Sequence, residues 1–500
     1  MLIPLFNFLK GLNSQISAFL HGLDGLAALS GGNISRKLGA ILKDVGYYRE
    51  GAQLQDGKSI LGLYDFHQNS TTQKLLATVD DATSDDTQLF YKIPAGSWIE
   101  VTAAETAWAN VAGAKVEMVG FIDRAFIVGH SAVDGFLPIA TFTGTTFSTA
   151  DANLTSMPQG KFIVDYKDCL YVLNVRYGSA NYPYRAVKST IVTAGAITWP
   201  TDLTNIIDFD FGHEITGAME AFDKLFVWTE YDTWYWDNSE KRRIWAYGCS
   251  AHRTIQRKGS YLFWADGEAV YLSTGGQPIP ISGPIEDYIK GASNPRDFFA
   301  TIVDEEYILY VGTVEVDGIS YSNCEVIFNI ATSTWRVREN GSPLTAYAKY
   351  NVSGSFRRLM GDNDGNVWHK SKYSDATIYG ADEVIVGSSA GKDISAFIEL
   401  PPLHMDAPSV AKDTKQIVVY ALRAQGVRVR MRRIDSNTRI LNEYQTIGEL
   451  TKYINTFEVD CKKGELIQLS FAETSKNPYF SILGVEFDVQ RSSNTLKKPR

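Results

Sequence analysis

The chain has 500 residues, of which 44% are apolar and 21% are charged, a composition typical of folded globular proteins rather than disordered ones. Because a single hydrophobic core stops growing at about 250–300 residues, we expect several domains or a repeated architecture. The formal net charge of -9 argues against a protein that grips a nucleic-acid duplex with clustered cations, although an acidic channel would let DNA slide past without adhering.

No run approaches the ~20 apolar residues of a membrane-spanning helix. The apolar N-terminus also lacks the basic start and the small-residue cleavage site of a signal peptide. We therefore expect a soluble, unprocessed chain. The four cysteines are far apart and form no CxxC pair, which predicts isolated buried thiols rather than disulfides or a zinc ribbon.

Apolar residues recur at three- and four-residue steps in the first 45 residues, and Gly31 and Gly32 follow them. This is the helical period with a stop signal, so the pattern predicts a partly helical N-terminal segment over residues 1–45. Its apolar face either packs on its own protein or docks on a partner subunit. The candidate docking residues are Leu12, Ile16, Phe19, Leu20 and Leu23.

Between residues 46 and 390 the pattern changes to short runs in which aromatic and aliphatic residues alternate after a polar turn. Seven such runs start about 35–65 residues apart, a spacing typical of four-stranded propeller blades. Closing blades into a ring leaves only short, protected strand edges. We therefore predict a six- or seven-bladed β-propeller over residues 46–390. The runs are SILGLYDF (59–66), RAFIVGH (124–130), DCLYVLNV (168–175), KLFVWTEYDTWYW (224–236), SYLFWADGEAVYLS (260–273), EYILYVGTVEV (306–316) and RRLMGDNDGNVWHKS (357–371).

The turns between these runs support hairpins. Asp-Gly occurs at 266–267, 317–318 and 364–365 between alternating segments, and this pair is a strong hairpin signal. In VIFNIATSTWRVRE (326–339) a short turn leads to Trp335, and an aromatic at such a place often fills the gap between blades. An irregular sandwich with ordinary core tryptophans is the alternative.

Residues 391–490 also contain short alternating runs, but these runs no longer follow the pattern of the predicted blades. Five to seven short strands in this stretch, separated by turn signals, predict a β-sandwich. Residues 491–500 form a short basic tail that we expect to be flexible. The fold class is therefore all-β, a propeller followed by a C-terminal sandwich, with a short helical N-terminal segment.

The phosphate-binding motifs GxxxxGK[ST] and GxGxxG and the zinc-binding motif HExxH are all absent. The seven histidines are scattered without metal-ligand spacing. The turn at residues 361–368 resembles neither the Asp-containing turn of sialidases nor an EF-hand closely enough, and a tight hairpin explains it. We therefore assign no catalytic, cofactor-binding or metal-binding residue and expect no enzymatic activity.

One strand pattern in the sandwich is unusual. In VRVRMRR (427–433) alternation places Arg428, Arg430 and Arg432 on one face of a strand. On an acidic protein this arginine ladder is a candidate subunit interface with a neighbour's carboxylates. Pairing with acids of its own sheet is the alternative.

Four stretches together resemble the tail-hub or nozzle proteins of short-tailed bacteriophages. They are GYYREGAQLQDGKSILGLYDF (46–66), GSYLFWADGEAVYLSTGGQPIPISGPIEDYI (259–289), DISAFIELPPLHMDAPSVAKDTKQIVVYAL (393–422) and NPYFSILGVEFDV (477–489). In the second stretch, PIEDYI is expected to form a short helix. The resemblance covers the chain from about residue 30 to 490 and rests on turns and aromatics.

The resemblance implies a structural component of the virion tail, made in the cytoplasm of the host bacterium. It implies a hexameric ring around the channel for viral DNA, which passes without sequence-specific binding. Its implied partners are head-to-tail connector or adaptor proteins and tail fibres or spikes, and its implied role is in genome retention and ejection. Two alternatives remain open: a propeller-type glycosidase or polysaccharide depolymerase, and a propeller that binds other proteins.

Overall fold

The fold is known from a computed structural model. It describes residues 2–5, 12, 28–30, 32–35, 40–69, 72–84, 86–94, 96–193, 195–199, 205–209, 212–316, 318–352, 354–372, 381–385, 391–394, 396–401, 412–435, 443–461, 465–473 and 480–491.

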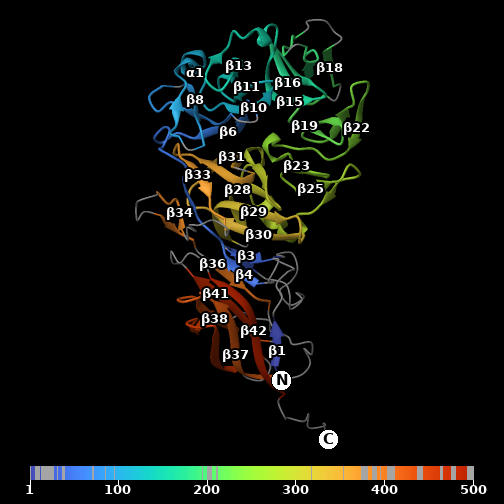
Figure 1. Cartoon of the computed structure of the whole chain (residues 1–500). Coiled ribbons are helices and arrows are strands. Elements are labelled where there is room, and N and C mark those ends of the chain that lie inside the picture. Colours follow the sequence, from blue (N-terminus) through green and yellow to red (C-terminus); the bar gives the residue numbers. More distant parts are fainter. Residues whose placement is uncertain are drawn as a thin grey trace.

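Seven antiparallel sheets of the described chain are arranged in a ring (Figure 1). The first strand of each sheet contacts the first strand of the next sheet or the turn leading into it, and β31 of the seventh sheet contacts β6 of the first. This is a seven-bladed propeller, so the all-β prediction is confirmed and the blade number is seven. The first four blades contain β6 (Ile60–His67), β7 (Gln73–Asp80), β8 (Thr87–Lys92) and β9 (Ile99–Glu100); β10 (Lys115–Phe121), β11 (Arg124–Ser131), β12 (Gly135–Phe136), β13 (Ala140–Phe142) and β14 (Phe147–Ser148); β15 (Gln159–Tyr166), β16 (Cys169–Tyr177), β17 (Ala180–Lys188) and β18 (Ile206–Asp208); β19 (Gly217–Ala221), β20 (Lys224–Trp228), β21 (Thr233–Trp236) and β22 (Lys241–Trp245).

Of the last three blades, the seventh contains one strand from the N-terminal part of the chain. The fifth to seventh blades contain β23 (Gln256–Lys258), β24 (Tyr261–Ala265), β25 (Val270–Ser273) and β26 (Ile279–Pro280); β27 (Phe299–Val303), β28 (Glu306–Val316), β29 (Ile319–Asn329) and β30 (Thr334–Glu339); β31 (Leu344–Val352), β32 (Ser355–Asp362), β33 (Val367–Lys370) and β5 (Tyr47–Arg49). Because β5 pairs with β33, with Tyr48 opposite His369, an N-terminal strand completes the last blade and closes the ring.

Each of the seven sequence runs falls in a different blade, so the alternating pattern correctly located every blade. Helices are short: α1 (Thr102–Ala107), α2 (Glu286–Lys290) and 3-10 turns at Ala152–Leu154, His252–Thr254, Gly283–Ile285 and Pro295–Asp297. The helix predicted in PIEDYI is present as α2. No described helix has the length and apolarity that crossing a membrane requires.

Buried aromatic residues fill the gaps between neighbouring blades. Trp245 and Trp264 stack with ring centroids 5.6 Å apart between the fourth and fifth blades. Trp335 of the sixth blade is buried, and its indole N–H donates to the carbonyl of Ile281, 2.9 Å away, beside the fifth blade. The interpretation of Trp335 as a filler between blades is therefore confirmed.

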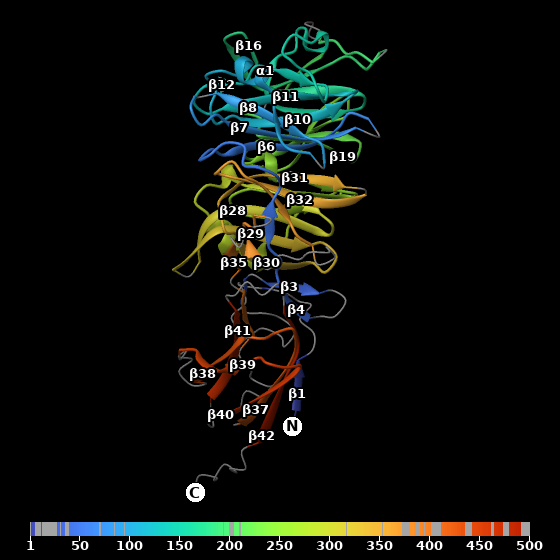
Figure 2. The ribbon, with the colours of Figure 1, turned by 60° about the vertical axis from the view of Figure 1, so that its left-hand side comes forward.

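A β-sandwich extends from the sixth blade, so the molecule is elongated (Figures 1 and 2). The outermost strand β30 pairs in parallel with β2 at Ser30 and Val337, and the sheet continues into the sandwich, nine strands in all. The strands beyond β30 are β2 (Ala28–Ser30), β36 (Ala396–Glu399), β41 (Glu465–Glu473), β38 (Arg428–Asp435) and β39 (Gln445–Glu449). The second sheet contains β3 (Gly32–Ser35), β4 (Ala40–Lys43), β42 (Ser481–Arg491), β37 (Lys412–Leu422), β40 (Ile454–Cys461) and β1 (Leu2–Leu5); β34 (Ala381–Asp382) and β35 (Lys392–Asp393) pair separately.

The division at residues 45 and 391 differs from this arrangement, because β1 to β4 belong to the two sheets of the sandwich. The reason is that a single short strand cannot satisfy its own backbone groups. Here β1 and β4 pair with β42, β2 pairs with β30 and β36, and β3 pairs with β4. The predicted helix and the candidate docking residues Ile16, Phe19, Leu20 and Leu23 lie outside the described residues, as do residues 492–500. Leu12 is described: it is buried, its N–H donates to the Trp335 carbonyl at 3.2 Å, and it packs on its own chain.

Buried ion pairs hold the N-terminal segment between the two bodies. Lys43 at the end of β4 pairs with Glu473 of β41, and both side chains are almost fully buried. The next residue, Asp44, accepts from Arg336 at 3.1 Å and from Arg338 at 2.6 Å, both on β30. The segment therefore ties the sandwich to the sixth blade before it enters the seventh.

Candidate functional site

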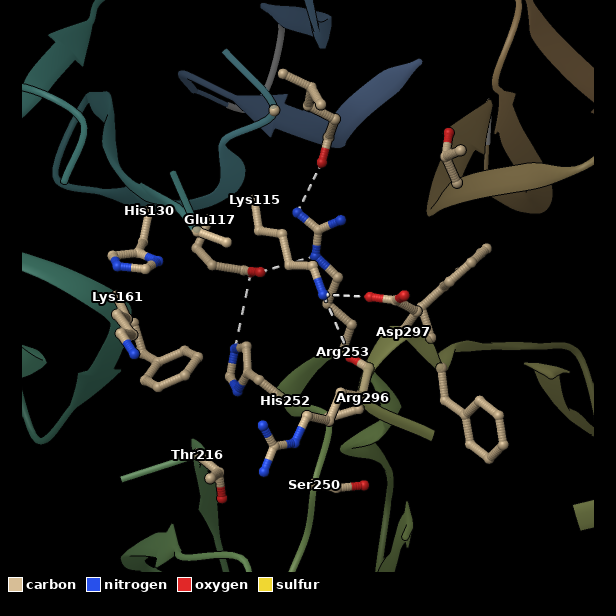
Figure 3. Close-up of a pocket in the computed structure, with 18 of the residues that line it drawn as sticks. Lys115, Glu117, His130, Lys161, Thr216, Ser250, His252, Arg253, Arg296 and Asp297 are labelled. Atoms are coloured by element: carbon tan, nitrogen blue, oxygen red, sulfur yellow. Dashed lines mark hydrogen bonds and ion pairs between the residues drawn. The ribbon is translucent and has the colours of Figure 1, made fainter. Parts of the chain in front are cut away.

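A cavity of about 610 Å³ lies on the propeller axis. Every blade contributes to its wall from its first strand or from the turn leading into that strand. Pockets of this size accept small organic molecules. We call it the axial cavity. Its charged and histidine side chains include Glu214. The others, labelled in Figure 3, are Lys115, Glu117, His130, Lys161, His252, Arg253, Arg296 and Asp297.

Ion pairs join different blades across this wall. Lys115 of the second blade donates to Asp297, 2.8 Å away, next to the sixth blade. Lys161 of the third blade donates to Glu214, 2.9 Å away, before the fourth blade. All four side chains are partly exposed, so these pairs place charge at the cavity more than they stabilise the fold.

Arg253 is the most anchored of the cavity residues. Its Nε donates to Glu117 at 2.9 Å, and its Nη2 donates to the carbonyls of Leu61 at 2.7 Å and Val116 at 2.9 Å. A planar guanidinium suits this fixed fork of acceptors. Arg253 thus connects the turn before the fifth blade to the first and second blades.

The tautomer of His252 follows from its backbone contact. The N–H of Ala218 donates to its Nδ1 at 3.3 Å, so Nδ1 is the acceptor and Nε2 carries the proton. Nε2 lies 3.7 Å from a carboxylate oxygen of Glu117, as Figure 3 shows. Burial lowers the pKa of His252, which keeps the ring neutral at pH 7.

His130 and Lys161 lie side by side on one side of the axial cavity (Figure 3). Burial and the Lys161 ammonium lower the pKa of His130 to about 4. Burial raises the pKa of Glu214, but the hydrogen bond and charge of Lys161, the Asn174 hydrogen bond and the Arg296 charge together outweigh burial and lower the pKa overall. At neutral pH this side of the cavity therefore holds a neutral imidazole beside an ion pair.

The hydroxyl of Ser250, another wall residue, is buried and has no hydrogen-bond partner among the described residues. A buried polar group without a partner is costly, so an incoming ligand or water would stabilise it. No described group of three or more His, Cys, Asp or Glu side chains is placed to hold a metal ion.

The arginine ladder is arranged as the alternation predicted, with Val427, Val429 and Met431 buried. Its members differ in their contacts. Arg432 donates to Glu399 at 3.0 Å and to Gln468 at 2.7 Å within its own sheet. Arg428 lies 3.8 Å from Glu449, and both are more than half exposed. The alternative of pairing within the sheet therefore holds for Arg432.

The turn at residues 361–368 is a tight hairpin, as predicted. One carboxylate oxygen of Asp362 accepts from the backbone N–H groups of Asp364 at 2.9 Å and Asn366 at 2.8 Å, and the other accepts from the Trp368 indole at 2.7 Å. Gln53 and Gly57 donate to Asp364. The carboxylate of Asp362 therefore stabilises the turn itself, and the turn packs against the loop that follows β5.

Sequence reasoning missed the axial cavity. Its residues are separated by up to 286 positions, from Ser59 to Thr345, and share no motif. The available signal was positional, because most of these residues lie at or near the start of a first strand, whereas His130 and Tyr310 lie on second strands. That signal needs the exact strand order in every blade, which alternation alone does not give.

No family model and no curated protein sequence matches the chain. Solved structures with related shapes include a fucose-specific lectin from Aleuria aurantia, 10% identical, covering 56% of this chain and 94% of the lectin with a TM-score of 0.34. Another is an exo-beta-1,3-galactanase from Phanerochaete chrysosporium, 9% identical, covering 89% of this chain and all of that one with a TM-score of 0.27.

The prediction that the chain has no enzymatic activity is contradicted by the second of these matches, because an exo-beta-1,3-galactanase is a glycosidase. We withdraw that prediction. Likenesses at this level carry no argument for a substrate or an activity of this chain. They are also silent on the bacteriophage resemblance, which stays a prediction.

Proposed function

We propose that the chain is a subunit of the tail hub, or nozzle, of a short-tailed bacteriophage. In this role several copies, six by the resemblance, form a ring around the DNA channel. The ring attaches to connector proteins on one side and to fibres or spikes at its periphery. It retains the genome and then lets it pass.

The observation that carries the proposal is the continuity between propeller and sandwich. One nine-stranded sheet runs from the innermost strand of the sixth blade to the far edge of the sandwich, and one hydrophobic cluster spans both bodies. A subunit that links a connector to peripheral proteins must transmit force without a hinge. A sheet and a core shared by both bodies supply that stiffness.

The axial cavity is not the DNA channel of this proposal. At about 610 Å³ it is sized for a small molecule, so the channel lies between subunits. On the sandwich, Leu422, Tyr453 and Ile454 are 44%, 51% and 46% exposed and adjoin one another, since Ala421 bonds the Tyr453 carbonyl and Tyr420 pairs with Ile454. We assign this apolar patch, the exposed Arg428 and the half-buried Arg430 to contact with a second copy.

Light scattering tests the assembly. The purified chain, alone or with connector proteins, is expected to form a ring of several copies. Arg428→Glu combined with Arg430→Glu is expected to impair the ring and leave the fold unchanged by circular dichroism. Arg242→Glu, on the exposed last strand of the fourth blade, controls for the loss of positive charge. A chain that stays monomeric under every condition contradicts the proposal.

A second function, a glycosidase or polysaccharide depolymerase, is favoured by three carboxylates in the wall of the axial cavity: Glu117, Glu214 and Asp297. A glycosidase needs two carboxyl groups on either side of a bond. Turnover of a panel of bacterial surface polysaccharides, abolished in Glu117→Gln and in Asp297→Asn, would replace the tail-hub proposal. Assembly without turnover supports the tail hub.

A further inference from the structure

We propose that the axial cavity binds a small organic acid of about monosaccharide size, with its carboxylate beside Lys161 and His130 and its body against the apolar wall. This inference concerns binding only and does not depend on a role in a tail.

The balance of charge in the wall favours an anion. Four cationic side chains line the cavity against three carboxylates, although the protein as a whole carries a net charge of -9. The fourth cation, Arg296, pairs with Glu230 at 3.1 Å, and Glu230 is not part of the wall. Among its own lining residues the wall thus has one more cation than carboxylates, on a protein whose net charge is negative, and an excess of one sign of charge in a cleft concentrates ligands of the other sign.

Lys161 and His130 indicate where the acid group lies. Lys161 is near enough to His130 to depress its pKa, so both nitrogens face the same space, as Figure 3 shows. The His130 ring meets Phe136 edge-on at 5.0 Å, and no hydrogen bond to the ring is found among the described residues. A carboxylate here would accept from the ammonium and from the imidazole, and its charge would offset the effect of Lys161 on the ring.

The rest of the wall suits a hydroxylated body. Phe162 packs against His252 with the two rings tilted and their centroids 4.7 Å apart. Together with Ile60, Leu61 and Ile215 it forms an apolar surface that matches the C–H face of a sugar ring. On the polar side, the unpartnered Ser250 hydroxyl and the Glu117 carboxylate offer a donor and an acceptor for hydroxyl groups. A small number of placed polar groups in an apolar wall is the usual composition of a ligand site.

Isothermal titration calorimetry on the full chain at pH 7 tests the inference with glucuronate, glucose and sulfate as probes. We expect glucuronate to bind at least ten-fold more tightly than glucose, because only the acid engages Lys161, and more tightly than sulfate, because only the sugar covers the apolar wall. Sulfate as tight as glucuronate, glucose as tight as glucuronate, or no binding of glucuronate each overturns the inference.

One strand supplies both the variant and its control. Lys161 lies near the start of β15, and Lys167 lies in the turn after its end; each pairs with one carboxylate, but only Lys161 lines the cavity. Lys161→Gln is expected to weaken glucuronate binding ten-fold or more, and Lys167→Gln less than two-fold. Equal effects of the two substitutions contradict the inference.

The titration of His130, followed by nuclear magnetic resonance and assigned with His130→Gln, gives a readout apart from affinity. Bound glucuronate should raise the pKa of His130 from about 4, since a carboxylate beside the ring favours its charged form. An unchanged titration with glucuronate bound elsewhere would refute the placement.

Discussion

The closure of the ring depends on Glu50, and replacing it by Gln should weaken the propeller more than any exposed ion pair does. Glu50 follows β5, and its carboxylate accepts from Lys92 of the first blade at 2.7 Å and lies 3.3 Å from His369 Nδ1 of the seventh. Burial raises the pKa of Glu50, but the hydrogen bonds from His369 and Lys92 outweigh it and lower the pKa from 4.5 to about 2.

This pKa shift sets the magnitude. One pKa unit corresponds to about 1.4 kcal/mol, so the ionised carboxylate stabilises the folded chain by about 3 kcal/mol at pH 7. The cost of removing one partner of a buried pair, about 3–5 kcal/mol, agrees, since the Lys92 side chain is only 4% exposed. We expect Glu50→Gln to lower the free energy of unfolding by about 3 kcal/mol.

The pH dependence gives a second measure. A carboxylate with a depressed folded pKa stabilises fully above its unfolded pKa of 4.5 and progressively less as pH falls towards 2. The difference between wild type and Glu50→Gln should therefore shrink to about 1 kcal/mol at pH 3.

Urea unfolding followed by tryptophan fluorescence measures both effects, and hydrogen exchange should show faster exchange in residues 47–50 and 367–370. Glu220→Gln is the control, because its pair with Arg257 is about one-third exposed on both sides and should contribute less than ~1 kcal/mol. Equal losses in the two variants would refute the account of ring closure.

Three further predictions concern other contacts. Gly365→Ala should cost more than about 2 kcal/mol, because its φ is +72° and a Cβ would lie 1.8 Å from the Gln55 carbonyl oxygen; thermal unfolding measures it. Burial raises the pKa of Asp382 to about 6 against the opposing effect of Arg338, so the folded chain holds that proton more tightly than the unfolded chain. The free energy of unfolding of the wild type should therefore rise as pH falls from 6 towards 4. Asp382→Asn should lack this rise when both proteins are compared by urea unfolding. Arg432→Ala should cost about 2 kcal/mol in the same assay because it leaves a buried carboxylate without its cation.

Each of these has its own control. Gly354→Ala, where φ is +81° and nothing lies within 4 Å, should cost only about 1 kcal/mol; an equal loss at both glycines would mean that the clash with Gln55 is relieved. Identical pH profiles for wild type and Asp382→Asn would remove Asp382 as the cause. Arg430→Ala should change stability by less than ~0.5 kcal/mol, and a larger effect than that of Arg432→Ala would reverse the assignment of contacts in the ladder.

The blades could be predicted because the sequence signals that mark each blade lie close together in the chain. Alternation and Asp-Gly turns are set by neighbours in the chain, and each of the seven runs marks a separate blade. The path of residues 28–49 could not be predicted in this way. Strands β2, β4 and β5 find partners more than 300 residues away, such as His369 for Tyr48 and Ser481 for Leu42, and nothing near them in the sequence indicates those partners.

The candidate site was hidden for a related reason. Lys161, Glu214 and His252 are ordinary polar residues at the edges of strands, and only ring closure brings them around one cavity. The arginine ladder was visible because strand alternation is local, yet whether Arg432 meets Glu399 or solvent depends on which strand lies beside it.

The path of residues 28–49 also governs when the chain can fold during synthesis. Strand β5 leaves the ribosome long before its partner β33, and β4 leaves it long before its partner β42. The first six blades can assemble as they emerge, whereas the ring and the sandwich must wait for the last segment of the chain. Contacts this distant in sequence slow folding. Because the ring and the sandwich both depend on this one segment, neither opens without disturbing the other, so unfolding should be slow as well.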